Sequence, residues 1–359
     1  MNHTGLYSPF KINRPLSEEE IKNQLRQDYT GMGKADSLAL DDTVVIRMNS
    51  TYLELVDKYY SDRGMPESLV FIMLSLFVFF FLSVTYLLFF NPTGTPNTLS
   101  GVFGTLLACV MSLSMAIWMS TYLRKSWFTW THYPVRFNRK SKMVHVFKVD
   151  GSIISVPWKD VFFTRGRAGP GAMPEWSIDG HILAEDGKTV IDTFSLGFSN
   201  TRQELITNWA FVRSYMEVED CLSDLKDIIV LCPPVAEHRE SFIFGLQYMM
   251  RVESRLEWPF TLILLPLTLL GGVARFVAMH TSKIPRWSAA VEEDCRVAPD
   301  DPINVSAANN PKHIWRYVLA NQSLEEYNAL YQRQTAAMAR LREKVRKSVK
   351  AVHVQGDEQ

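Results

Sequence analysis

The amino-acid sequence predicts an α+β membrane protein, in which a two-helix transmembrane hairpin carries an antiparallel β domain, a third apolar helix and a helical C-terminal tail. Two uncharged apolar stretches, residues 69–90 and 101–123, are each long enough to cross a hydrocarbon core of about 30 Å as a helix. From residue 134 onward, apolar and polar residues alternate with the period of β-strands. The chain therefore divides into a membrane part and a soluble part.

The composition argues against several classes of function. The 359 residues include 38 basic and 38 acidic ones, so the net charge of zero gives no sign of nucleic-acid binding. Neither apolar stretch contains the ionisable residues that ion pathways use, which disfavours transport. The four cysteines and eight histidines lack the spacing of a metal site, so we expect no metal and no cofactor. We also expect reduced thiols, with a disulfide between Cys221 and Cys232 as the alternative.

Residues 1–65 are expected to form a cytoplasmic segment before the hairpin. Ser17 and Glu20 have the spacing of a capping box, which predicts a short helix. Residues 43–48 are rich in β-branched side chains and predict a strand, after which Asn49 or Ser50 predicts the start of a second helix. The N-terminus lacks the pattern of a signal peptide, so we expect the first apolar helix to direct membrane insertion.

Residues 66–123 make up the expected hairpin, with an uncharged connection at residues 91–100. Arg124 and Lys125 follow the second helix directly. Basic residues mark the cytoplasmic side of membrane proteins. The sequence therefore predicts a multi-pass protein whose β domain and both termini lie in the cytoplasm.

Residues 134–217 are predicted to form a β domain of about six short antiparallel strands closed by one helix. The pairs Asp150-Gly151 and Asp186-Gly187 predict tight hairpins. Thr201 with Glu204 then predicts the start of an amphipathic helix. This order and spacing resemble the pleckstrin-homology-like barrel of bacterial membrane-attached proteins. Members of that fold bind peptides, lipids or nothing known, so the resemblance does not define a function.

Basic residues near the predicted turns and on the tail are the candidate contacts with anionic lipid or a partner. Anionic headgroups attract each such residue by about 1 kcal/mol near the membrane surface. The alternative is a solvated flank that only follows the positive-inside pattern. The candidates are Arg139, Lys140, Lys142, Arg165, Arg167, Arg340, Lys344 and Lys347.

Residues 218–257 are expected to be a helical connector to a third apolar helix at residues 258–279. The apolar core of this helix is short, and it contains Pro266 and Arg275. Because basic residues flank both of its ends, we expect a kinked, membrane-associated helix that does not cross, with a third span as the alternative.

Residues 280–359 are predicted to be a Pro- and Asp-rich linker followed by an amphipathic helix. Ser323 and Glu326 have the spacing of a capping box and predict where this helix begins. Its polar side is basic, which suits an anionic membrane surface or a partner helix.

Catalytic motifs are missing from the sequence. It contains no phosphate-binding loop, nucleophile elbow or kinase signature. His145 and His181 lie in predicted strands, where a hydrogen-bonded structural histidine is more common than a catalytic base. We therefore expect that the protein is not an enzyme and has no catalytic, cofactor-binding or metal-ligating residues.

Four short stretches resemble a poorly characterised proteobacterial inner-membrane family that is associated with type VI secretion effector genes. They are residues 49–57 (NSTYLELVD), 136–139 (RFNR), 156–158 (VPW) and 281–287 (TSKIPRW). The resemblance implies an immunity or accessory role at the bacterial inner membrane. It also implies a protein partner, either a cognate toxin or a secretion-associated protein.

The function expected from the sequence is therefore that of a membrane-anchored, non-enzymatic binding protein. Its expected partners are membrane lipid and the toxin or secretion-associated protein, and no nucleic acid. The alternative is a regulatory or structural membrane module that binds lipid or a protein complex through the β domain and the basic tail.

Overall fold

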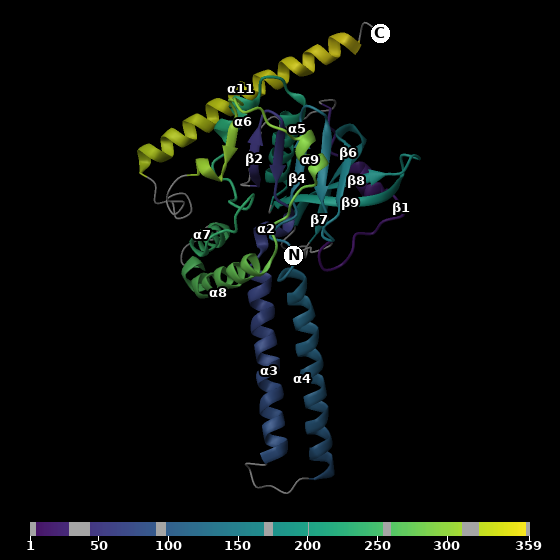
Figure 1. Cartoon of the computed structure of the whole chain (residues 1–359), viewed down its shortest axis with the longest axis vertical. Coiled ribbons are helices and arrows are strands. Elements are labelled where there is room, and N and C mark those ends of the chain that lie inside the picture. Colours follow the sequence, from purple (N-terminus) through teal and green to yellow (C-terminus); the bar gives the residue numbers. More distant parts are fainter. Residues whose placement is uncertain are drawn as a thin grey trace. The chain divides into compact units, whose positions relative to one another are not determined.

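A computed structural model describes residues 5–28, 44–90, 98–168, 175–199, 201–253, 260–310 and 323–356 of the chain (Figure 1). The chain combines helices and sheets in two compact units. Unit 1 consists of residues 1–61, 131–240 and 284–359, and unit 2 consists of residues 62–130 and 241–283. The segment before the hairpin, the β domain and the tail, which the sequence analysis treated as separate parts, thus form one unit.

Unit 1 contains a six-stranded antiparallel sheet in the order β10-β2-β3-β4-β5-β6. Leu55 of β3 pairs with Val135 of β4, so the chain between these neighbouring strands leaves unit 1 and returns beside its point of departure. The hairpin is therefore an insertion within a sheet. The strands are β2 (Val45–Asn49), β3 (Tyr52–Leu55), β4 (Val135–Asn138), β5 (Met143–Phe147), β6 (Ile153–Pro157) and β10 (Asn304–Ser306).

A second antiparallel sheet of unit 1 has the order β1-β9-β8-β7. Gly151 and Gly187 adopt positive φ angles of 86° and 65°, which confirms the two predicted Asp-Gly turns. The strands predicted between residues 134 and 199 are also confirmed. The strands of this sheet are β1 (Arg14–Pro15), β7 (Val161–Ala168), β8 (Glu175–Leu183) and β9 (Thr189–Ser199), and a short 3-10 helix, η2 (Trp158–Asp160), precedes β7.

The core of unit 1 is aromatic where helix α5 (Arg202–Glu217) covers the strands. The ring of Trp209 lies 4.8 Å from that of Phe163 and 5.6 Å from that of Trp158, measured between centroids. Leu205 and Val212, one turn to either side of Trp209, are fully buried. Thr201 caps this helix by accepting from the Glu204 amide, so the predicted helix and its apolar face are confirmed.

The helix predicted to start after Asn49 is wrong, because residues 52–55 form strand β3. The Asn49 side-chain oxygen accepts from the amides of Thr51 and Tyr52 at 2.9 and 2.8 Å, which makes a tight turn between β2 and β3. Asparagine favours both turns and helix starts, so the local pattern is ambiguous. Pairing with β4, which lies much later in the chain, makes residues 52–55 a strand instead of a helix. Helix α2 (Lys58–Asp62) begins only later.

The stretch predicted as a linker, within its described part at residues 296–310, is instead built into unit 1. Strand β10 pairs with β2, and the Asp301 carboxylate accepts from the Ser50 amide at 2.9 Å. These pairings lie far apart in sequence and leave no local periodicity. The short helix α9 (Ala289–Asp294) precedes this stretch, and the 3-10 helix η3 (Ala307–Asn309) lies within it.

The C-terminal helix α11 (Leu324–Gly356) packs on α6 (Leu222–Ile228) in unit 1. The predicted capping box is confirmed, because Ser323 and Glu326 exchange side-chain to amide hydrogen bonds at 3.1 Å. Ala337 and Leu341 are buried. The N-terminal helix α1 (Glu18–Lys22) likewise has its predicted capping box at Ser17.

Unit 2 contains two helices that are long and apolar enough to cross a membrane, α3 (Met65–Phe90) and α4 (Leu99–Ser126). They run side by side (Figure 1). Only 6% and 11% of the residues in their most apolar windows are buried, so most of these apolar side chains are at least partly exposed. The two predicted helices are thus confirmed, and residues 91–97 of the predicted connection lie outside the described residues.

Buried polar groups tie together the ends of α3 and α4. The Glu67 carboxylate accepts from the Gly64 amide at 2.6 Å and from the Ser126 hydroxyl. Arg63 donates to the Trp130 carbonyl at 2.6 Å. Buried polar groups without partners cost free energy, so these bonds hold the start of α3 next to the end of α4.

The third apolar stretch forms helix α8 (Phe260–Thr281), which packs on α7 (Phe242–Glu253) and on α3. Arg275 is fully buried, donates to the Arg63 carbonyl at 2.9 Å and lies 4.6 Å from the centroid of the Tyr248 ring. This helix is shorter in its apolar part than α3 and α4. Its association with a membrane stays a prediction, and its expected residues 258 and 259 lie outside the described residues.

Gly64 provides a test of the packing in unit 2. Its φ is 115°, and a Cβ atom there would lie 2.6 Å from the Gly271 carbonyl oxygen. We expect Gly64→Ala to lower the melting temperature of the full-length protein in detergent, since the positive φ alone costs roughly 1–2 kcal/mol. Gly104→Ala is the matched control, because a Cβ atom there meets nothing within 4 Å. Unfolding is followed by circular dichroism. Equal melting temperatures for the two variants would contradict this packing.

Candidate functional site

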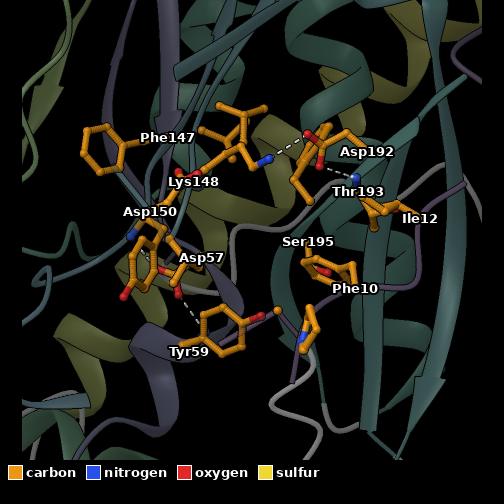
Figure 2. Close-up of a pocket in the computed structure, with 17 residues that line it drawn as sticks. Phe10, Ile12, Asp57, Tyr59, Phe147, Lys148, Asp150, Asp192, Thr193 and Ser195 are labelled. Carbon is orange, nitrogen blue, oxygen red and sulfur yellow. Dashed lines mark hydrogen bonds and ion pairs between the residues drawn. The ribbon is translucent and has the colours of Figure 1, made fainter. Parts of the chain in front are cut away.

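An apolar pocket of about 350 Å³ lies between the two sheets of unit 1 (Figure 2). Strands β4 and β5 form one wall and β9 forms the opposite wall. The segment at residues 5–12 supplies a third wall through Phe10 and Ile12. Val135, Val146 and Phe194 are among the other apolar residues that line it. Its size and apolar lining are those of pockets that take a small molecule or a protruding side chain.

Charged groups at this pocket are engaged with the protein itself. The buried Asp57 carboxylate accepts from the amides of Tyr59 and Tyr133 at 2.9 and 2.8 Å. Lys148 Nζ lies 2.7 Å from an Asp192 carboxylate oxygen (Figure 2). Burial raises the pKa of the Tyr59 hydroxyl, which therefore stays protonated. The arrangement suits binding of an apolar group better than acid–base chemistry.

A row of polar side chains crosses the other part of the unit, on one face of the six-stranded sheet. Register pairs Arg47 with Glu54, Glu54 with Arg136, Arg136 with His145, and His145 with Ser155. These residues come from five adjacent strands, β2 to β6. We call these five residues the charged row. Glu54, Arg136 and His145 are each only 3% exposed.

Arg136 is the centre of the charged row. Its Nε atom lies 3.2 Å from a Glu54 carboxylate oxygen, and its Nη1 atom lies 3.2 Å from Glu292. The guanidinium carbon lies 4.6 Å from the Tyr52 ring centroid and 4.9 Å from that of Trp287. Burial alone would lower the pKa of Arg136, but the Glu54 carboxylate, Tyr52 and Glu292 together outweigh burial and raise the pKa. Arg136 is therefore a buried cation held by two rings and two carboxylates.

The segment that contains α9 covers this face of the sheet. Trp287 Nε1 donates to a Glu54 carboxylate oxygen at 2.7 Å. Val291 and Cys295 pack against Tyr52 in an apolar cluster. Next to the charged row, a polar hollow of about 430 Å³ is lined by Arg47, Arg136, Trp287 and other residues of unit 1. The hollow exposes a charged lining to solvent, in contrast to the apolar pocket between the sheets.

At the far end of the row, three side chains with metal-binding atoms come together. His145 Nδ1 lies 2.8 Å from Ser155 Oγ, and Nε2 lies 3.0 Å from Asp294 Oδ2. Burial lowers the pKa of His145, with Asp294 opposing, and burial raises the pKa of the Cys295 thiol to about 11. A thiol that stays protonated near pH 7 is a poor nucleophile.

The basic residues predicted to contact lipid near the turns lie within hydrogen-bonding networks. Arg139 donates to the carbonyl oxygens of Tyr215 and, at 2.6 Å, of Val218. Lys142 donates to the Met216 carbonyl. Cations at this point satisfy the last carbonyl groups of α5. Lys140 is exposed.

The remaining candidate cations are spread over unit 1. Arg165 bonds to the Asn23 side chain, and the Arg165 and Arg167 guanidinium groups lie 5.4 and 5.5 Å from the Trp176 ring centroid. Arg340 and Lys344 pair with the Asp224 carboxylate at 2.6 and 2.8 Å, while Lys347 is exposed. Arg340 and Lys344 thus hold α11 on α6, and lipid contact by these eight residues stays a prediction.

The charged row was not predicted from the sequence. A signal for it exists, because Arg47, Arg136 and His145 each alternate with apolar neighbours within a predicted strand, whereas Glu54 lies where a helix was predicted. Such a pattern ordinarily indicates a solvated face. The α9 segment, which follows more than a hundred residues later, covers this face. No disulfide joins any of the four cysteines, all of which lie in the described residues, as expected.

A double-mutant cycle tests the pairing of Glu54 with Arg136. Arg136→Met leaves the buried Glu54 carboxylate without its closer cation and with only Arg47 Nε, 3.8 Å away, which costs up to about 3–5 kcal/mol of unfolding free energy. We expect Glu54→Leu combined with Arg136→Met to cost less than the sum of the single changes. Arg296→Met is the control, because the Arg296–Glu293 pair is exposed and such pairs contribute about 0–1 kcal/mol. Additive effects in chemical denaturation would refute the pairing.

Comparison with known proteins gives one family. No curated protein and no solved structure matches the chain. Residues 112–299, about half of the chain, match a family of unknown function, DUF6708. The matched segment includes Arg136, His145, Trp287 and Cys295, but not Glu54. The chain belongs to the DUF6708 family.

Proposed function

We propose that this protein is a membrane-anchored, non-enzymatic binding protein whose soluble unit takes an apolar group of a protein partner into the pocket between its sheets. The observation that carries the proposal is the pocket itself, since its lining is mainly apolar and the charges of Asp57, Lys148 and Asp192 are engaged internally. A well-formed, mainly apolar pocket of this size is the default hypothesis for a binding site.

Anchoring by α3 and α4 is supported by their exposed apolar side chains. Phe79 and Phe103 are 70% and 69% exposed, and many neighbours are similar. Soluble proteins rarely leave such large apolar surfaces in water, whereas lipid would cover them. Arg124 and Lys125 at the end of α4 favour a cytoplasmic position for unit 1, at the bacterial inner membrane.

The pleckstrin-homology-like fold is part of the proposal. Its support is two antiparallel sheets with α5 covering their aromatic core. Strands β2, β3 and β10, from outside residues 134–217, extend the first sheet beyond the expected barrel. Proteins of that fold bind peptides or lipids, in line with a pocket that takes an apolar group.

The proposed partner is a toxin or another protein of a type VI secretion system, against which this protein acts as an immunity or accessory protein. Support comes from the resemblance of residues 49–57, 136–139 and 281–287 to an inner-membrane family linked to such effectors. In the structure these three stretches meet, because they supply Glu54, Arg136 and Trp287 to one cluster. The resemblance therefore covers parts that pack together.

Growth rescue tests the role and the pocket together. Cells producing the toxin encoded next to this gene should grow when the full chain is co-expressed. Ile12→Asp places a charge in the pocket wall at a side chain that is 47% exposed, so folding should persist while rescue is lost. Ile21→Asp is the control, since Ile21 is 56% exposed and does not line the pocket.

Two outcomes of this experiment would contradict the proposal at different points. If the unaltered chain fails to rescue growth, the immunity role is wrong. If Ile12→Asp rescues as well as the unaltered chain at equal protein level, the pocket is not the contact surface.

Reporter fusions test the membrane topology. Alkaline phosphatase inserted within residues 91–97 should be active, because that connection is proposed to face the periplasm and the enzyme folds only there. The same reporter after Gln359 should be inactive, while a fluorescent protein at that position should be bright. The reverse pattern would place unit 1 outside the cytoplasm.

A further inference from the structure

We propose that His145, Asp294 and Cys295 together bind one divalent transition-metal ion, with zinc as the best match. The three side chains offer one nitrogen, one oxygen and one sulfur ligand. Zinc accepts all three ligand types and is commonly held by three protein ligands and a water molecule. This inference concerns the α9 segment and does not depend on the proposed partner.

The ligand atoms are close enough to share an ion. They all lie within 4.8 Å of one another, and His145 Nε2 lies 3.0 Å from Asp294 Oδ2. Around a tetrahedral zinc ion, with bonds of about 2.0–2.3 Å, ligand atoms are roughly 3.3–3.8 Å apart. Side-chain rotations that move these atoms by about 1 Å therefore suffice to complete the geometry.

The surrounding residues orient these ligands as the outer shell of a metal site does. Nδ1 of His145 faces the Ser155 hydroxyl at 2.8 Å, which leaves Nε2 directed toward Asp294. The side chains of Asn138 and Ser141 both donate to Asp294 Oδ2 at 2.9 Å. Metal-bound histidines and carboxylates are usually held by hydrogen bonds of this kind.

Access and charge are also suitable for a cation. His145 and Cys295 are 3% and 2% exposed, but the Asp294 side chain is 35% exposed and gives a path for the ion and for a bound water molecule. Arg136, which also hydrogen-bonds with the Cys295 thiol, is countered by Glu54 and Glu292, each 3.2 Å away. The local charge therefore does not exclude a divalent ion.

An ion at this position would fasten the α9 segment to the sheet. His145 comes from β5, while Asp294 ends α9 and Cys295 follows it. Binding to the folded chain alone stabilises it in proportion to the logarithm of ion concentration over Kd. The site would thus help to keep Trp287 and Glu292 in contact with the charged row.

The test uses the full-length protein, purified in detergent without a histidine tag and stripped with a chelator. We expect about one zinc ion per chain after dialysis, and a thiolate-to-cobalt absorption band with cobalt(II). Zinc should raise the melting temperature of the unaltered protein. Cys295→Ser should abolish the cobalt band and weaken zinc binding at least tenfold.

Two further variants make the result decisive. Cys232→Ser is the matched control, because Cys232 is 1% exposed and lies outside the cluster, and it should bind zinc normally. Asp294→Asn keeps an oxygen that accepts from Asn138, so it decides the question if Cys295→Ser does not fold. Zinc binding that is absent from the unaltered protein, or unchanged in Asp294→Asn, would overturn the proposal.

Discussion

The buried contact between Arg136 and Glu54 is the interaction on which the rest of unit 1 depends. Both side chains are 3% exposed, so each needs the other to offset the loss of hydration. Glu54 lies before the inserted hairpin, Arg136 follows it, and Trp287, which bonds to Glu54, lies after α8. One cluster therefore joins all three stretches of chain that build unit 1, and it exists only when all three are folded together.

This constraint explains how the membrane helices are accommodated. The chain that forms helices α3 and α4 is inserted between β3 and β4. These two strands pair from Tyr52 with Asn138 to Leu55 with Val135. Beside the pocket, the Asp57 carboxylate accepts a hydrogen bond from the Tyr133 amide and so joins the chain before the hairpin to the chain after it. Strand β4, which follows the insertion, contributes Val135 to the pocket and Arg136 to the charged row, so both sites are built on the strand at which the chain re-enters unit 1.

Local patterns predicted the helices and the strands between residues 134 and 199 well, because alternation, Asp-Gly turns and capping boxes are local. These local patterns failed where pairing with strands far away in the chain determines the secondary structure. Residues 52–55 became a strand through pairing with β4, and residues 304–306 joined the sheet through β2. The same limit hid the candidate sites. His145 was expected to be a structural histidine. The sequence did not show that Asp294 and Cys295 lie beside it, because they are about 150 positions away in the chain.

The central claim is that unit 1 binds its partner through the pocket between the sheets. Photo-crosslinking in living cells that produce the proposed toxin partner measures this most directly, with a photoreactive amino acid at position 12 in the pocket wall or at position 331 on α11. Tyr331 is 59% exposed and distant from the pocket lining in sequence. The account predicts a covalent adduct with the toxin from position 12 and none from position 331. An adduct from position 331 alone would show that the tail, and not the pocket, meets the partner.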